Sequence, residues 1–535
     1  MNLKLTSKES IFRNELIFAV DAKSINIDST MVNLYMLLKN NGTRPKLVRS
    51  GNNRNDTEIN IEKIKQYLIG LEKDGTIEGI SQNPEAVEVW IRNNLVNLIF
   101  RGNPDKEKVS SLRPIHIESY RVRNAKQTRD YNSADQVYLM LGQNPKVKQD
   151  LINFLRAGFD KDTNEILESN DLDVDSLGLL QIIRKVTKDF VESQSGLNVV
   201  KPLLTAQAEK FCDDIRKLLV YQNSIPRNVL IDYIKTLISF HLALYFQKLV
   251  HLLPRIVENS SLNVEDNWCI VVDITDNFDS RIASLAMRDV EYFLNSMYDY
   301  IKATFQINSA LSYLNLDRNN SSYIDEALNV LKTKGDGFEK FFQIKYQEVH
   351  QAKDERGRKH NDEEKQMAED YKKAIEDNTQ YESSFFDKYI QLLVSSDRGN
   401  YQYKYSRELF DNICQKNKER GFLAQGRSRK HPRRFVLGSR LLETLIQILV
   451  LEATPTGFQS RSLSIEELIG ALRDQYGLII NGLNEDRFKD ADVNTHLAFK
   501  ENVEALKQKL RLIGFYNDLS DAYILQKIRP RYPKN

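Results

Sequence analysis

The sequence predicts a mainly α, multidomain protein with winged-helix-like modules near both termini and one short buried strand region in the middle. Its 535 residues exceed one ordinary domain of about 100–200 residues. Proline is absent from Arg255 to His431, and apolar residues there often recur at spacings of three and four, the period of an amphipathic helix. Near each end of the chain, helix patterns precede a turn and a short β-prone stretch, the order found in winged helices.

Composition is typical of a soluble globular protein: apolar residues make up 41% and charged residues 28%. Cys212, Cys269 and Cys414 lie far apart without a CxxC pair, which excludes a cysteine-only zinc site and argues against a disulfide framework. The first residues lack a signal-peptide pattern. The apolar stretch from Tyr233 to Val257 contains Lys and His residues, so it indicates a buried or amphipathic helix and no membrane span. We expect a cytoplasmic protein.

The first predicted domain covers residues 1–130 and is winged-helix-like with a basic extension. Met31 to Leu38 is an apolar helix candidate, and basic residues follow it. Ile61 to Leu71 places four apolar residues on one helix face. Gly75 suits the left-handed position that ends a helix, and Thr76 and Ile77 can begin a wing strand.

Two helical domains are predicted next, over residues 131–258 and 259–414. Within the second, Trp268 to Ile274 is a continuous apolar run rich in β-branched residues, which indicates a buried strand. The segment 351–374 holds 14 charged residues among 24 and almost no apolar ones. We expect a charged hairpin or linker there.

The last predicted domain covers residues 438–535 and is winged-helix-like. Three helices are expected, over Leu441 to Leu451, Ser464 to about Tyr476, and Phe499 to Ile513. Ser464 and Glu467 have the spacing of a capping box. A wing strand is expected at Ala522 to Leu525. The long insertion between the second and third helices departs from a tight helix-turn-helix.

A basic linker is predicted over residues 415–437, because Gln415 to Arg434 holds eight basic residues and one acid. Residues 401–535 contain 23 Lys and Arg against 16 Asp and Glu, a net charge of +7, while the first 400 residues carry −5. Such a cluster suits nucleic-acid phosphates, and the alternative is a solvated linker. The residues predicted to contact phosphates are Arg427, Arg429, Lys430, Arg433, Arg434 and Arg440.

No catalytic motif is found in the sequence. No glycine is followed by lysine, so the phosphate-binding pattern GxxxxGK[ST] is absent. The seven histidines form no HxxxH or HExxH pair. Asp273, at the end of the predicted buried strand, is expected to be structural. We therefore expect a protein that is not an enzyme and has no cofactor and no metal.

The C-terminal run RRFVLGSRLLETLIQILVL, with LRDQYGLII and FKENVEALKQKLRLIGFYNDLSDAYILQKIRPRY after it, resembles subunits of multi-gene bacterial antiphage clusters. The resemblance is to the methylation-associated defence type and, more loosely, to phosphorothioation-dependent restriction proteins. FHLALYFQKLVHLLP, from Phe240 to Pro254, is similar to the same set. This resemblance implies a subunit that works beside a separate ATPase, nuclease or methyltransferase.

Together these features predict a non-catalytic DNA-binding or adaptor subunit of an antiphage defence complex. Two alternatives stay open. One is a protein–protein scaffold whose winged helices dock partner subunits without touching DNA. The other is an enzyme whose active site is assembled from residues far apart in the sequence.

Overall fold

The protein is mainly α-helical, as predicted, and its described strands form only short two-stranded pairs. The structure is a computed structural model. It describes residues 11–47, 59–100, 105, 107–160, 162–163, 165–167, 172–186, 190–191, 196–197, 199–316, 320, 322–351, 373–428, 431–455, 457–516 and 527–534. The predicted charged segment at 351–374 therefore lies almost entirely outside the described residues.

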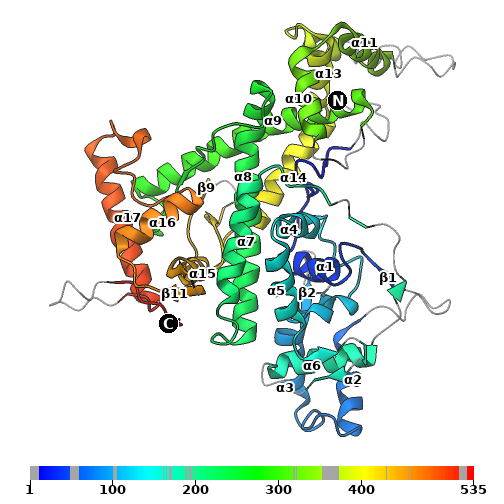
Figure 1. The fold of residues 1–535 in the computed structure, drawn as a ribbon, viewed down its shortest axis with the longest axis vertical. Coiled ribbons are helices and arrows are strands. Elements are labelled where there is room, and N and C mark those ends of the chain that lie inside the picture. Colours follow the sequence, from blue (N-terminus) through cyan, green and yellow to red (C-terminus); the bar gives the residue numbers. More distant parts are fainter. Residues whose placement is uncertain are drawn as a thin grey trace.

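Short helices and small strand pairs make up the N-terminal third (Figure 1, blue to cyan). Helix α1 forms where predicted and is buried along almost its whole length. The elements are α1 (Ile27–Lys39), β1 (Lys46–Leu47), α2 (Ile61–Lys73), α3 (Pro84–Trp90), the π-helical η1 (Ile91–Leu95), β2 (Val96–Ile99), β3 (Lys108–Leu112), the 3-10 helix η3 (Ile117–Arg121), α4 (Ser133–Leu141), α5 (Pro145–Arg156), β4 (Phe159–Asp160), β5 (Glu165–Ile166), α6 (Val174–Val186) and β6 (Phe190–Val191).

Two long helices, α8 (Arg227–Asn259) and α9 (Arg281–Leu314), pack against each other at the centre, and α7 (Thr205–Leu219) lies beside α8. The predicted helix from Tyr233 to Val257 is part of α8. Among the described residues, α8 is the one helix long and apolar enough to cross a membrane by length and composition. Its most apolar stretch is 83% buried inside the protein, as expected of a core helix.

A further helical group gathers at the end of α9 (Figure 1). It consists of α10 (Tyr323–Thr333), α11 (Asp336–Gln351) and α13 (Phe385–Ser395). Helix α14 (Asp397–Ile413) then runs back along α9 and α8. The C-terminal elements are β8 (Leu423–Gln425), β9 (Arg433–Phe435), α15 (Ser439–Leu449), β10 (Leu451–Thr454), β11 (Gly457–Ser460), α16 (Ile465–Tyr476), β12 (Leu478–Ile479), the 3-10 helix η4 (Asp486–Phe488) and α17 (Val493–Leu512).

The predicted buried strand is confirmed as β7 (Ile270–Val271). It pairs in parallel with β12, matching Ile270 to Leu478 and Val271 to Ile479. Shortly after β7, Asp273 makes a parallel bridge to Val436, directly after β9. This segment has hydrogen-bonded backbone neighbours on both sides, which explains why its residues form a continuous apolar run.

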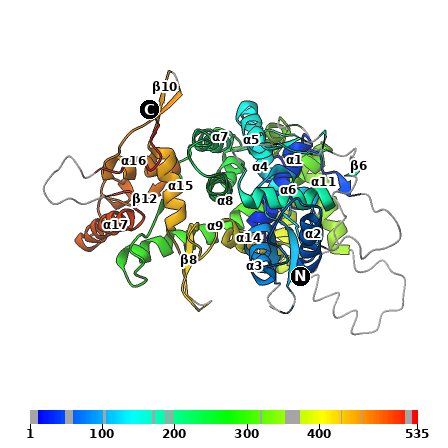
Figure 2. The same cartoon turned by 90° about the horizontal axis from the view of Figure 1, so that it is seen from below.

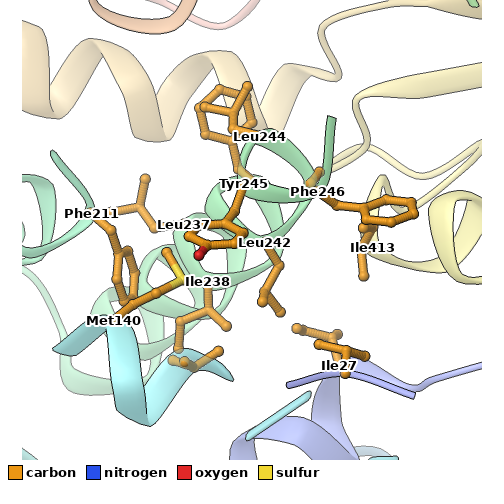
Figure 3. Close-up of a cluster of buried hydrophobic side chains, with 14 of the residues drawn as sticks. Ile27, Met140, Phe211, Leu237, Ile238, Leu242, Leu244, Tyr245, Phe246 and Ile413 are labelled. Carbon is orange, nitrogen blue, oxygen red and sulfur yellow. The ribbon is translucent and has the colours of Figure 1, made fainter. Parts of the chain in front are cut away.

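One large hydrophobic cluster extends from Phe12 to Ile528. Figure 3 shows part of it, where side chains from α8, among them Leu242 and Tyr245, meet Ile27 of α1, Phe211 of α7 and others from α4 and α14. The cluster crosses every predicted domain boundary. Those boundaries stay predictions.

The N-terminal winged-helix prediction needs correction at its wing. Helix α2 ends as expected, with Gly75 in the left-handed region at φ 71°. Thr76 and Ile77, however, lie in a bend and form no strand. The reason is local: the Glu72 carboxylate accepts hydrogen bonds from the backbone N–H groups of Ile80 at 2.8 Å and Ser81 at 2.9 Å, which folds the chain back onto α2.

The C-terminal winged-helix prediction is only partly described by the structure. Its three helices form as α15, α16 and α17, and the Ser464–Glu467 capping box is present. The β10–β11 hairpin separates the first two helices, and β12 and η4 separate the last two. The predicted wing strand at Ala522 to Leu525 lies outside the described residues, so the winged helix itself stays a prediction.

Candidate nucleic-acid interface

The predicted basic linker contains an antiparallel hairpin, β8–β9, in place of an extended connection. Its register matches Leu423 to Phe435 and Gln425 to Arg433. Leu423 and Phe435 are buried, so they fix one end of the hairpin in the core. The other end projects from the body (Figure 2).

Arg433 is bound to an acid of α14. Its Nε donates to Asp411 Oδ1 at 2.6 Å, and its Nη2 donates to Asp411 Oδ2 at 2.7 Å. This two-bonded geometry is the strongest arrangement of an arginine with a carboxylate. Only 10% of the Arg433 side chain is exposed. Arg433 therefore anchors the base of the hairpin.

Arg434 lies still deeper. Its Nε donates to Asp273 Oδ2 at 2.7 Å, and both side chains are buried. Asp273 Oδ1 also accepts from the backbone N–H of Thr275 at 2.9 Å and from its hydroxyl at 2.7 Å. Asp273 is therefore held by an ion pair and a local turn, which agrees with the structural role that we expected for it.

Arg433 and Arg434, which the sequence assigns to a basic linker, do not lie in an exposed connection. Both cations are neutralised by acids that lie 22 and 161 residues away in the sequence. No local sequence pattern indicates such partners, since the segment itself has no acid between Arg427 and Arg434. Any phosphate contact by this segment must therefore come from other residues.

Arg440 is also engaged inside the protein. Its Nε donates to Asp232 Oδ2 at 3.1 Å and its Nη1 donates to Glu443 Oε2 at 2.9 Å. Burial alone would lower the pKa of Arg440, but the hydrogen bond and charge of Glu443 and the charge of Asp232 raise it above its ordinary value. Arg440 thus belongs to an ion-pair network between α8 and α15.

Arg427 is exposed and lies in the hairpin loop, next to β8. Arg429 and Lys430 lie outside the described residues. Of the predicted contact residues that the structure describes, Arg427 is therefore the one placed at the surface without an ion pair. The hairpin offers a basic tip on an anchored base.

A second polar cluster, which the sequence did not reveal, lies in the core between α7, α8 and α16. His241 Nε2 lies 3.0 Å from Asp214 Oδ2, and the Tyr476 hydroxyl donates to the same oxygen at 2.8 Å. Gln207 Nε2 lies 3.0 Å from His241 Nδ1. An amide nitrogen can only donate, so Nδ1 accepts and the imidazole proton sits on Nε2.

This cluster resembles the histidine–carboxylate pair of many enzymes, but both nitrogens of its imidazole already have hydrogen-bond partners inside the protein. Burial lowers the pKa of His241, which favours the neutral ring. Burial alone would raise the pKa of Asp214, yet the His241 hydrogen bond and nearby positive charge lower it below its ordinary value. Both ring nitrogens are occupied and both side chains are fully buried. The cluster therefore ties three helices together and leaves no nitrogen for a substrate proton.

Within the described part of the chain, no group of three or more His, Cys, Asp and Glu residues is placed to hold a metal ion.

Comparison with known proteins gives one family. A protein-family model described as methylation-associated defense system protein MAD7 matches residues 7–532. The similarity that the C-terminal segments suggested thus extends over nearly the whole chain. No curated protein and no solved structure matches it.

Proposed function

The chain belongs to the family of methylation-associated defense system protein MAD7, and we propose that within its defence system it is a non-catalytic subunit that binds DNA through the tip of the β8–β9 hairpin. In this role it bridges DNA to partner enzymes of the same system, such as an ATPase, nuclease or methyltransferase.

The observation that carries the proposal is the division of the hairpin into an anchored base and a basic tip. Arg433 and Arg434 use their charges internally, so they fix the direction of the hairpin. Arg427 is exposed, and Arg429 and Lys430 follow it closely in the sequence. Cations on a projecting loop can approach a phosphate backbone without a groove in the protein surface.

Electrophoretic binding assays over a series of salt concentrations test this proposal. The variant Arg427→Ala, alone and combined with Arg429→Ala and Lys430→Ala, should weaken binding to all DNA sequences alike. Each lost phosphate contact flattens the plot of log affinity against log salt by about one unit. Arg156→Ala is the matched control, because Arg156 is an exposed cation at the end of α5, far from the hairpin in sequence.

Unchanged affinity and salt slope in the triple variant would contradict the proposal. The scaffold would then be the better interpretation. An observation favours it as the second candidate: Leu483, Val493 and Leu497 are exposed beside one pocket at the start of α17. Cleavage of the DNA on addition of a divalent metal would instead favour the enzyme with a dispersed active site.

A further inference from the structure

A pocket of about 390 Å³ opens between α8, the β7 segment, α9 and η4. Its volume lies in the range of small-molecule sites, about 300–1,000 Å³. The pocket is separate from the hairpin tip, and none of the predicted contact residues lines it.

Aromatic side chains form much of its wall. Trp268 and Phe293 are buried at the pocket, while Tyr292 of α9 is 65% exposed at its edge. A large aromatic side chain that stays exposed beside two buried ones offers apolar surface to a ligand. Walls of this kind suit a planar aromatic ring.

A buried polar group belongs to the wall of the same pocket. Gln247 of α8 lines the pocket and is 0% exposed. Its Oε1 has no hydrogen-bond partner among the described residues, and its Nε2 has only the sulfur of Cys414 at 4.0 Å. Leaving such an acceptor unpaired is unfavourable. A ligand N–H group would satisfy it.

One cation at the pocket has no acidic partner among the residues that the structure describes. Asp289 is fully engaged: Arg487 Nη2 donates to its Oδ1 at 2.6 Å, and the backbone N–H of Val271 donates to its Oδ2 at 2.7 Å. Arg288 also lines the pocket, is exposed, and makes no ion pair with any residue that the structure describes. Arg288 and Tyr292 stand four residues apart on α9, so their side chains are neighbours on one helix face. The uncompensated charge favours an anionic ligand.

We propose that this pocket binds a nucleotide. The aromatic walls hold the base, Gln247 Oε1 accepts from an N–H group of the base, and Arg288 pairs with the phosphate. The volume suits one nucleotide unit, which can be a free mononucleotide or a single nucleotide of a strand. The proposal does not depend on DNA binding by the hairpin.

Calorimetric titration of the full-length protein with the common nucleoside 5′-monophosphates tests the proposal. At least one should bind, its nucleoside should bind about tenfold more weakly, and inorganic phosphate alone should not compete. Arg288→Ala should weaken the nucleotide about tenfold and leave the nucleoside unchanged, because only the phosphate contact is lost. Tyr292→Ala should weaken both. Arg281→Ala and Tyr298→Ala are the matched controls, since both residues are exposed on α9 outside the pocket.

Gln247→Leu separates the base contact from folding. This change removes the unpaired acceptor at similar volume, so the protein should stay folded while nucleotide and nucleoside both bind more weakly. A short single-stranded DNA distinguishes the two sources: if it displaces the mononucleotide, the pocket takes a nucleotide of a strand, and if it does not, the ligand is a free nucleotide. Absence of binding by every monophosphate at about 1 mM would overturn the proposal. So would a nucleotide affinity of Arg288→Ala and Tyr292→Ala equal to that of the native protein.

Discussion

Two arginines of one hairpin, seven residues apart, have opposite environments. Arg434 is buried against Asp273, whereas Arg427 is exposed. The same residue type thus has a structural role at one position and offers a surface charge at the other. The difference depends on which residues the fold brings next to each side chain.

Replacing each arginine by alanine should separate these roles. Arg434→Ala leaves the buried Asp273 without its ion pair, and we expect a loss of about 3–5 kcal/mol in the free energy of unfolding. Arg427→Ala should change it by about 0.5 kcal/mol or less. Urea denaturation measures both. A variant Arg434→Ala with native stability but a reduced salt slope in DNA binding would show that Arg434 acts at the surface after all.

A buried histidine makes stability depend on pH. His116 is fully buried, and its Nδ1 accepts from the backbone N–H of Glu118 at 3.1 Å, capping η3. Burial, together with the positive charge of Arg227, lowers the pKa of His116 to about 3. Below the ordinary histidine pKa of about 6.5, His116 therefore binds a proton in the unfolded chain but not in the folded protein.

The free energy of unfolding should accordingly fall as the pH drops from about 6.5 toward 3. Between pH 7 and pH 5 the His116 contribution to this loss is about 2 kcal/mol. His116→Asn and His116→Gln keep an acceptor but cannot titrate, so each should lose about 2 kcal/mol less than the native protein over that range. Chemical denaturation at both pH values measures this difference. Equal losses in all three proteins would mean that His116 is protonated in the folded state.

At the scale of elements, one side chain of α17 joins two parallel strands. Asn502 is fully buried. Its Nδ2 donates to the carbonyls of Val272 and Ile480, both at 2.9 Å, and its Oδ1 accepts from the backbone N–H of Ile274 at 2.8 Å. Strands β7 and β12 are each only two residues long, so their own ladder is short. The carboxamide extends it from the side.

Asn502→Leu should therefore be strongly destabilising although the volume is conserved. It leaves three buried backbone groups without partners, and we expect a loss of at least about 3 kcal/mol. Asn494→Leu is the matched control, because Asn494 is exposed on the same helix. Thermal or urea unfolding of the two variants gives the comparison. Similar stabilities would mean that water replaces the carboxamide.

At the scale of the whole molecule, the C-terminal region is built onto the central helices. The Tyr221 hydroxyl of the central region donates to the Gln447 carbonyl at 2.8 Å, and Tyr233 donates to Glu443 at 2.6 Å. Strand β12 finds its partner in β7. The hydrophobic cluster crosses the same border. The C-terminal helices therefore bury their apolar faces against residues more than 200 positions earlier.

A fragment of residues 438–535 expressed alone should consequently lack a cooperative unfolding transition. Its faces toward α7, α8 and β7 would be exposed to water, and burial of apolar surface is the main favourable contribution to folding. Circular dichroism during urea titration tests this, with the full-length protein as control. A sigmoidal transition in the fragment would instead support the domain boundary at residue 438 that the sequence predicts.

The sequence by itself determined the features that depend on neighbouring residues. The apolar stretch from Tyr233 to Val257 located most of α8, and the Ser464–Glu467 spacing located the start of α16, whose end is marked by Gly477 in the left-handed region at φ 72°. Similarity in the C-terminal segments indicated the family. Only the tertiary structure decided that Arg434 is an internal residue and that Gln247, Trp268, Arg288 and Tyr292 line one pocket. Helix and cap signals act over a few residues. Ion pairs, parallel strand pairing and pocket walls join positions far apart in the sequence, and no local sequence pattern shows that these positions are in contact.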